Sequence, residues 1–184
     1  MYEVEVKAHL RNRESVQKKL EKMGCIFSDE LHQIDHIFIR GDVDFPPPYN
    51  SPVLRVRKQN NKHFFTMKIS QSNRQDCIEK ELEISDGDKM LDIVKFLKYK
   101  QVPIVNKKRI KTNINGIEIC LDVVEGLGEF IEAEKIVETE NVEDRRKIQE
   151  ELLTFLSELG ILSEDHLLGR KYDIMLFEKY GMEK

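Results

Sequence analysis

The chain has 184 residues, a length that suits a single domain spanning residues 1–184 and allows a sizeable core. Charged residues make up 35% of it, above the roughly 25% of an ordinary domain, yet the formal net charge is only −4. This near balance excludes the basic excess of a non-specific nucleic-acid binder and the acidic excess of a disordered tail.

The cysteines and the apolar residues limit where the protein works. Cys25, Cys77 and Cys120 are widely spaced, odd in number and without a CxxC pair, so neither a disulfide framework nor a zinc knuckle is indicated. The first residues do not form an apolar signal region, and no apolar run approaches the ~18 residues that a membrane span needs. We therefore expect a cytoplasmic protein with neither a membrane nor a nucleic-acid partner.

The first half of the chain begins with a strand pattern followed by a helix pattern. Residues 2–8 alternate between valine and charge, which puts Glu3, Glu5 and Lys7 on one face of a strand. A helix is predicted to follow, with Asn12 as its N-cap. Four further strand patterns then occupy residues 32–39, 53–58, 63–69 and 78–84.

A loop, three helices and three more strands complete the order. The segment Gly41–Pro52 holds three consecutive prolines, which cannot donate to a sheet ladder, and is predicted to be irregular. Ser85 is predicted to cap a second helix and Asn141 to open the longest one, whose apolar stripe suits the core or, as an alternative, a homodimer contact. The remaining strands are expected at residues 103–111, 117–123 and 129–137, and a short helix at 171–179.

The order of one strand, one helix and three strands occurs twice. Glu3 and Glu5 recur as Glu79 and Glu81, 76 residues later, and each pair precedes a helix. This weak duplication is far longer than a solenoid repeat and predicts two related halves of one sheet. Eight strands suffice for closure, so we expect an α+β fold with a closed eight-stranded antiparallel β-barrel and helices packed outside it.

Charged side chains share one face in strand after strand. The clearest sets are Arg55 with Arg57, Thr66 with Lys68, Glu79 with Glu81, Lys107 with Arg109, Glu118 with Asp122, and Glu132 with Glu134. For any single strand, a solvated outer face with cross-strand ion pairs is the simpler explanation. The predicted helices, however, carry apolar stripes that need a sheet face to cover, which turns the charged faces inward.

An interior that carries both signs of charge predicts a ligand that carries both signs. A triphosphate with bound Mg²⁺ or Mn²⁺ meets this need, because arginine and lysine match phosphate oxygens while carboxylates are hard oxygen ligands for these ions. Without such a ligand, the packed carboxylates would repel one another and some would titrate at higher pH.

Several motifs resemble one known family. Glu3-Val4-Glu5-Val6-Lys7 resembles the ExExK signature of the CYTH superfamily, the triphosphate tunnel proteins that include class IV adenylyl cyclases, thiamine triphosphatases and inorganic tripolyphosphatases. Further motifs follow in the family's order up to about residue 134: Gln33-Ile34-Asp35, Leu54-Arg55-Val56-Arg57, Thr66-Met67-Lys68, Glu79-Lys80-Glu81, Val105-Asn106-Lys107-Lys108-Arg109, Leu121-Asp122 and the segment 126–134. Chain length and the stretch LDVVEGLGEFIEAE are most similar to the class IV adenylyl cyclases, which convert ATP to cyclic AMP and pyrophosphate.

The resemblance implies a role for each matching residue. The implied triphosphate ligands are Lys7, Arg55, Arg57, Lys68, Lys107 and Arg109. The implied ligands of Mg²⁺ or Mn²⁺ are Glu3, Glu5, Glu132 and Glu134, with Asp122, Glu79 and Glu81 as further acids at matching positions. The implied catalytic residues are Glu5, Lys68 and Glu134.

Three functions are compatible with these residues. A cyclase would direct the ribose 3′-hydroxyl of ATP at the α-phosphorus with metal assistance, whereas a triphosphatase would direct water at the terminal phosphorus. A non-catalytic triphosphate binder would use the same walls without turnover. The chain also differs from the family pattern at two places: Ile37 stands where an aromatic residue is frequent, and Lys171-Tyr172 stands where cyclase-like members tend to have Ser-Tyr.

Overall fold

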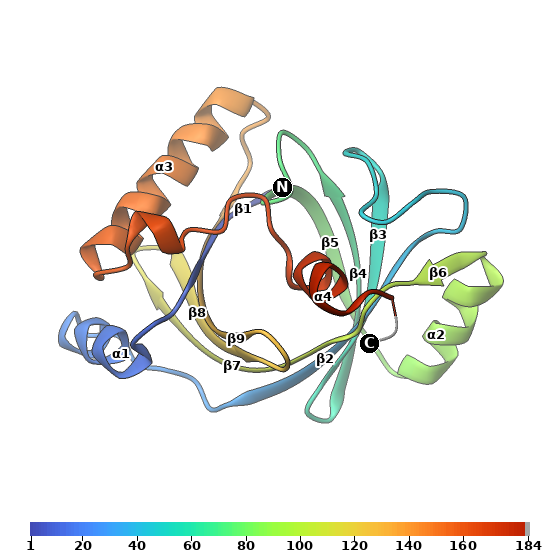
Figure 1. Ribbon diagram of the computed structural model, residues 1–184, viewed down its shortest axis with the longest axis horizontal. Helices are drawn as coiled ribbons and strands as arrows, with labels where there is room; N and C mark the ends of the chain where they lie inside the picture. Colours follow the sequence, from blue (N-terminus) through green and yellow to red (C-terminus); the bar gives the residue numbers. More distant parts are fainter. Residues whose placement is uncertain (183–184) are drawn as a thin grey trace.

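The computed structural model describes residues 1–182, in which antiparallel strands form a ring (Figure 1). Around the ring the strands run in the order β3, β4, β5, β1, β9, β8, β7 and β2, and pairing of β2 with β3 closes it. The ring strands are β1 (Tyr2–His9), β2 (Leu31–Arg40), β3 (Pro52–Gln59), β4 (Lys62–Ser70), β5 (Asp76–Ile84), β7 (Val105–Ile114), β8 (Ile117–Val124) and β9 (Gly128–Val137). The expected closed arrangement of eight antiparallel strands is thereby confirmed.

The helices cover the outer side of this ring. They are α1 (Arg13–Lys22), α2 (Gly87–Phe96), α3 (Val142–Glu158) and α4 (Tyr172–Tyr180), with a 3₁₀ turn at Ser163–Asp165. In Figure 1, α1 and α3 lie on one side of the ring and α2 on the other, while α4 lies across one opening. No helix within residues 1–182 is long and apolar enough to cross a membrane.

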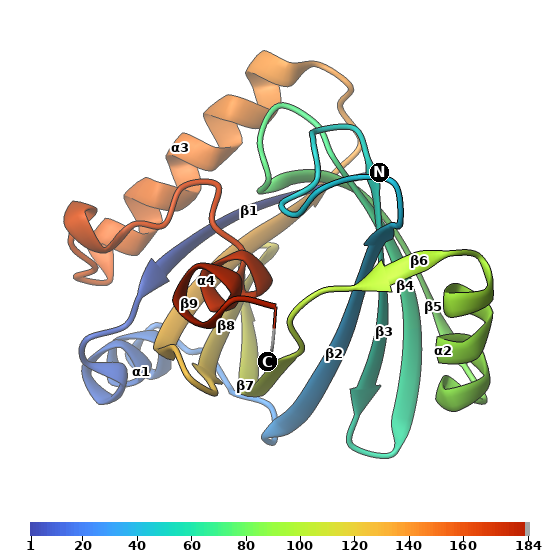
Figure 2. The ribbon, with the colours of Figure 1, turned by 45° about the vertical axis from the view of Figure 1, so that its right-hand side comes forward.

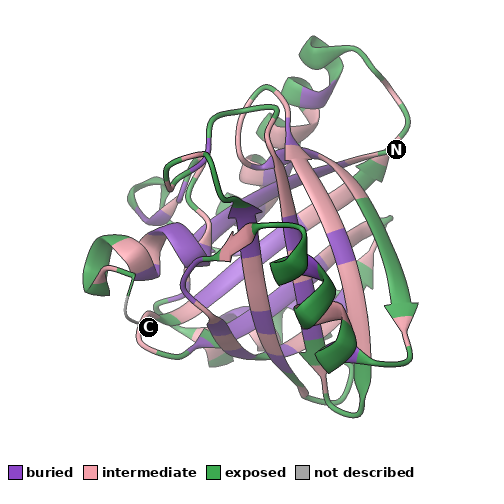
Figure 3. Cartoon of the chain, turned by 90° about the vertical axis from the view of Figure 1, so that its right-hand side faces the viewer, coloured by how far each residue is buried: buried purple, intermediate pink, exposed green. Residues whose placement is uncertain are grey.

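Alternation along each strand places apolar side chains under the helices and charged ones inside. On β1, Val4, Val6 and Ala8 are fully buried in the core that α1 and α3 complete, and the stripe of α3 contributes Leu152 and Leu156 to it. A second apolar cluster lies beneath α2, whose outer face is exposed (Figure 3). Burial of these two outer faces stabilises the ring and leaves its inner face to polar groups.

Most element boundaries agree with the expectations, and the exceptions have local causes. Asn12 and Asn141 are N-caps, as predicted, accepting hydrogen bonds from backbone N–H groups one turn into α1 and α3. The prediction of Ser85 as the cap of α2 is wrong: the carboxylate of Asp86 accepts from Lys89 N at 2.9 Å, so the helix begins one residue later.

Two further differences concern a strand boundary and an additional strand. The strand expected at residues 103–111 begins at Val105, since Pro103 has no N–H to donate to the ladder. The short strand β6 (Tyr99–Gln101) pairs with β2 outside the ring, and its three residues are too few to show an alternating pattern.

The seam between β1 and β5 is the shortest pairing of the ring and is reinforced from α3. Only Tyr2–Val4 pair with Asp76–Ile78 there. Arg145 on α3 donates from Nε to Asp76 Oδ1 at 2.7 Å, and its guanidinium lies 4.1 Å from the centre of the Tyr2 ring. Both partners of this ion pair are almost fully buried, so neither tolerates loss of the other.

Replacing Arg145 by alanine should lower the free energy of unfolding by about 3–5 kcal/mol, because the carboxylate of Asp76 would stay buried without its charged partner. Arg146→Ala is the matched control, since that neighbouring arginine is exposed. Urea unfolding of the two variants checks the difference. Equal stabilities would show that the ion pair does not hold the seam.

Candidate functional site

The inner face of the ring encloses one charged cavity of about 190 Å³. Every residue that the sequence assigns to triphosphate, metal or catalysis lines it except Asp122, which lies behind its wall and is fully buried. Nine basic and eight acidic side chains line the cavity in all, so the balance of the whole chain is repeated inside the ring. The roles implied by the family for these residues remain predictions.

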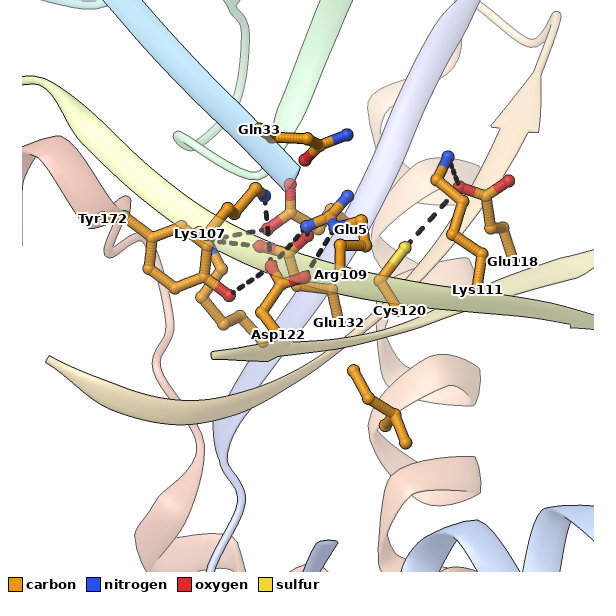
Figure 4. Close-up of polar contacts among 12 residues, drawn as sticks. Glu5, Gln33, Lys107, Arg109, Lys111, Glu118, Cys120, Asp122, Glu132 and Tyr172 are labelled. Atoms are coloured by element: carbon orange, nitrogen blue, oxygen red, sulfur yellow. Dashed lines mark hydrogen bonds and ion pairs between the residues drawn. The ribbon is translucent and has the colours of Figure 1, made fainter. Parts of the chain in front are cut away.

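Asp122 on β8 holds together the cations on one wall (Figure 4). Arg109 donates to both of its carboxylate oxygens, from Nε at 2.6 Å and from Nη2 at 2.5 Å. Lys107 Nζ lies 3.1 Å from Oδ2, and the Tyr172 hydroxyl donates to the same atom at 3.0 Å. Because these donors surround the carboxylate, Asp122 positions the cations that face the cavity and has no oxygen turned towards it.

Lys7 stands beside this group and is held by carboxylates and by an aromatic face. Its Nζ lies 3.0 Å from Glu132 Oε1 and 3.2 Å from Glu5 Oε1, and 3.9 Å from the centre of the Tyr172 ring. Burial alone would lower the pKa of Lys7, but Glu132 and Glu5 outweigh it and raise the pKa above its ordinary value. Lys7 is therefore a permanent positive charge in the cavity.

The opposite wall pairs cations and acids across β3, β4 and β5. Arg55 Nη2 donates to Glu81 Oε2 at 2.9 Å and to Thr66 Oγ1 at 3.1 Å. Lys68 Nζ lies 2.8 Å from Glu3 Oε1 and also forms an ion pair with Glu79. One member of each glutamate pair that suggested duplication, Glu3 and Glu79, thus contacts this lysine.

Arg57 differs from Arg55 because both arms of its guanidinium are occupied. It donates to Asp35 from Nε at 2.6 Å and from Nη2 at 2.7 Å. Burial alone would raise the pKa of Asp35, but Arg57 lowers it far below the ordinary range. The sequence analysis gave Asp35 no role. In the structure its carboxylate holds the Arg57 side chain in position.

Two acids of the cavity behave differently from these paired ones. Burial, followed by the like charges of Glu3 and Glu118, raises the pKa of Glu134 to about 8. Burial also raises the pKa of Glu3, although Lys68 opposes it. Glu134 forms no hydrogen bond or ion pair with any described residue. The cavity therefore holds two carboxyl groups whose ionised forms its own cations do not fully stabilise.

These carboxyl groups are where a divalent cation fits, because it would favour their ionised form. Glu134 lies directly across from Glu5 in the β1–β9 ladder and within electrostatic range of Glu3. The carboxylate of Glu5 is buried, and its Oε1 atom lies 3.2 Å from Lys7 Nζ. An all-carboxylate donor set suits Mg²⁺ or Mn²⁺. Among residues 1–182, no three acidic, histidine or cysteine side chains already surround one point, so these glutamates would have to turn to bind an ion.

The structure adds cavity residues that the sequence analysis did not select. They are Asp35, Ser70, Arg74, Lys111, Lys171, Tyr172 and Asp173, and the apolar residues Ile37, Pro47, Val53, Val105 and Ile174. Arg74 lies in a loop without periodicity, and Lys171, Tyr172 and Asp173 enter the cavity only because α4 folds back across the ring (Figure 2). Ile37 and the Lys171-Tyr172 pair were visible in the sequence as departures from the family pattern, and both line the cavity.

Comparison with known families agrees with this geometry. Residues 1–169 match the CYTH domain. The chain belongs to the CYTH domain family. The resemblance drawn from the motifs is thereby confirmed, and the ring with its charged interior is the fold expected of it.

Three similar proteins cover almost the whole chain. "Putative adenylate cyclase MJ0240" of Methanocaldococcus jannaschii is 34% identical over 94% of this chain and 97% of its own length. The PH1819 protein of Pyrococcus horikoshii OT3 is 29% identical, with a TM-score of 0.80 over 96% of this chain and 99% of its own. The "Putative adenylyl cyclase HpAC1" of Hippeastrum is 17% identical, with a TM-score of 0.58 over 97% and 96%, a likeness of fold alone.

Proposed function

We propose that this CYTH protein is a metal-dependent enzyme that binds ATP in the ring and converts it to cyclic AMP and pyrophosphate. The observation that carries the proposal is the cavity in which clustered cations face acids, one of which, Glu134, has a pKa raised to about 8 and no ion-pair partner among the described residues. Because acids and bases nearly balance there, the protein's own cations would not neutralise a triphosphate, which favours its entry together with divalent ions. The 34% identical relative named as an adenylate cyclase supports the choice of reaction.

In this proposal the cations bind and orient the triphosphate. Lys7 is buried, Arg55 and Lys68 are half-buried, and all three face the cavity, where a charge-assisted hydrogen bond to phosphate is stronger than in water. Arg109 and Lys107 face the same space while Asp122 fixes their directions. Their positive charges would stabilise the pyrophosphate as it leaves, with little reorganisation because the ion pairs already hold them.

The acids of β1 and β9 would hold the metal ions. Glu3, Glu5 and Glu134 have the donor chemistry, with one lysine contact each for Glu3 and Glu5 and none for Glu134 among the described residues, whereas Glu132 contacts both Lys7 and Arg109. A bound Mg²⁺ or Mn²⁺ supplies Lewis-acid polarisation of phosphate oxygens and makes the attacking hydroxyl more acidic. The carboxylates would also orient that hydroxyl in line with the α-phosphorus.

The second candidate is a triphosphatase with the same walls. It is favoured by the Hippeastrum protein, a fold neighbour that is described as having a dominant triphosphatase activity. The two reactions share the phosphate and metal ligands and differ in whether a ribose hydroxyl or a water molecule is placed in line with a phosphorus atom.

Analysis of the products decides between the two reactions. Purified protein is incubated with ATP or inorganic tripolyphosphate in the presence of Mg²⁺ or Mn²⁺, and the products are separated by ion-exchange chromatography. We expect cyclic AMP and pyrophosphate from ATP, and no product once EDTA is added. Release of ADP or orthophosphate would replace the cyclase by a triphosphatase, and binding without any product would leave a non-catalytic triphosphate binder.

A further inference from the structure

The loop between β2 and β3, residues 41–51, reaches the cavity at one of its prolines. Most residues of this loop are exposed, but Pro47 is buried and lines the cavity. Phe45 packs edge-on against Phe177 of α4, with 5.1 Å between the ring centres. Asn50 N donates to Ser70 O at 3.0 Å, which places the loop beside the turn that joins β4 and β5 (Figure 2). The loop therefore stands at the mouth of the cavity that α4 also covers.

Arg74, in the turn between β4 and β5, connects this loop to the cavity. Its Nη2 donates to Pro47 O at 2.9 Å, and its guanidinium lies 5.2 Å from the centre of the Tyr49 ring. The same side chain lines the cavity. A guanidinium has five N–H donors, and Pro47 O is the one acceptor for Arg74 among the described residues. Arg74 therefore has donors left for a ligand.

Arg74 also differs in its charge partners from the other three arginines of the cavity. Arg55, Arg57 and Arg109 each form an ion pair with a carboxylate. Arg74 forms none with any described acid. A phosphate oxygen that approaches the other three must compete with a carboxylate, whereas at Arg74 it meets a guanidinium bonded to a neutral carbonyl. A charge-assisted hydrogen bond is about twice as strong as a neutral one, so Arg74 can bind an anion without first giving up a charged partner.

We propose that Arg74 binds the triphosphate and connects the loop to it, keeping its hydrogen bond to Pro47 O while its free N–H groups donate to a phosphate oxygen. The inference rests on the proposed function, since it needs the triphosphate in the cavity. The loop is then held over the mouth most firmly when the ligand is bound. A closed mouth keeps water away from the reacting phosphorus, which favours attack by a hydroxyl of the ligand itself.

Hydrogen exchange of the loop, followed by mass spectrometry with and without ligand, tests this connection. The ligand is the analogue of ATP in which methylene groups replace both bridging oxygens of the triphosphate, so that it does not turn over, and it is added with Mg²⁺ at a concentration that saturates each variant. In the wild-type protein we expect exchange in residues 42–51 to slow about tenfold, the factor that one hydrogen bond to a charged group supplies.

Arg74→Met should remove this slowing and weaken binding of the same analogue, measured by calorimetry, by about tenfold. Arg74→Lys separates charge from connection. Lysine keeps the positive charge on a single nitrogen and lacks the planar fork that bonds in two directions, so this variant should keep most of the affinity and lose most of the slowing.

Arg40→Met is the matched control, because Arg40 also bonds this loop, through both carboxylate oxygens of Asp42, but is exposed and does not line the cavity. It should keep the wild-type affinity and the wild-type slowing. Slowing of exchange in Arg74→Met equal to that in the wild-type protein, or none in a wild-type protein that binds the analogue, would overturn the connection while the triphosphate site stands. If the analogue did not bind to the wild-type protein, the proposed function itself would fail and the connection with it.

Discussion

Replacing Glu134 by glutamine should lower metal-dependent turnover by orders of magnitude while the ring stays folded. Glutamine has the same shape and keeps one neutral oxygen, but it removes the anionic donor that faces Glu5 across the β1–β9 ladder. A hard divalent cation binds the amide oxygen far less strongly than a carboxylate, so the effect should appear in metal affinity as well as in rate. Steady-state assays over a range of Mg²⁺ or Mn²⁺ concentrations measure both.

The same substitution should stabilise the protein when no metal is present. The pKa of Glu134 is raised from the ordinary value of 4.5 to about 8, so its ionisation is less favourable in the folded chain than in the unfolded chain. A raised folded-state pKa gives stability that is complete below pH 4.5 and lost as pH rises through 8. Glutamine cannot ionise, so E134Q should melt at a higher temperature than the wild-type protein at pH 8, and the gap should narrow towards pH 5.

Glu138→Gln is the control for both readouts, because this glutamate follows β9 and is exposed. It should leave turnover and melting temperature at their wild-type values. Unchanged turnover in E134Q would remove Glu134 from the reaction. A lower melting temperature for E134Q in the absence of metal would instead show that its carboxylate stabilises the fold.

The strands and their inner faces could be predicted from the sequence because each is a local property. Alternation fixes which side chains share a face, so Glu3, Glu5 and Lys7 had to lie together wherever β1 was placed. The apolar stripes of the helices then decided which face was covered. Closure of the ring needed only the count of strands and the repeated order of elements.

The partners of the charges could not be predicted in this way. Asp122 and Glu134 both stand on inner faces, yet one is surrounded by Arg109, Lys107 and Tyr172 and the other has no partner among the described residues. That difference depends on the register of β7, β8 and β9 and on where the first residue of α4, Tyr172, lies against them.

The two arginines of β3 illustrate the point and should respond differently to the same substitution. Arg55 and Arg57 share one face and one motif, and the sequence assigns both to the triphosphate. Both arms of Arg57 are held by Asp35, whereas Arg55 reaches Thr66, Glu79 and Glu81 at 2.9–3.4 Å through Nη2, with no two-armed ion pair. A ligand oxygen can therefore recruit Arg55 by displacing weaker contacts.

Arg55→Met should accordingly weaken binding of tripolyphosphate with Mg²⁺ by about 10- to 100-fold, the range of one or two lost charge-assisted hydrogen bonds, and should change the unfolding free energy little. Arg57→Met should lower that free energy by about 3–5 kcal/mol, because Asp35 would remain buried without its main partner. Calorimetry and urea unfolding of both variants separate the two effects. If Arg57→Met weakened binding with no loss of stability, or Arg55→Met did the reverse, the division of labour inferred from the Asp35 ion pair would be wrong. The expected outcome would show that Arg57 stabilises the cavity wall through Asp35, whereas Arg55 binds the phosphate.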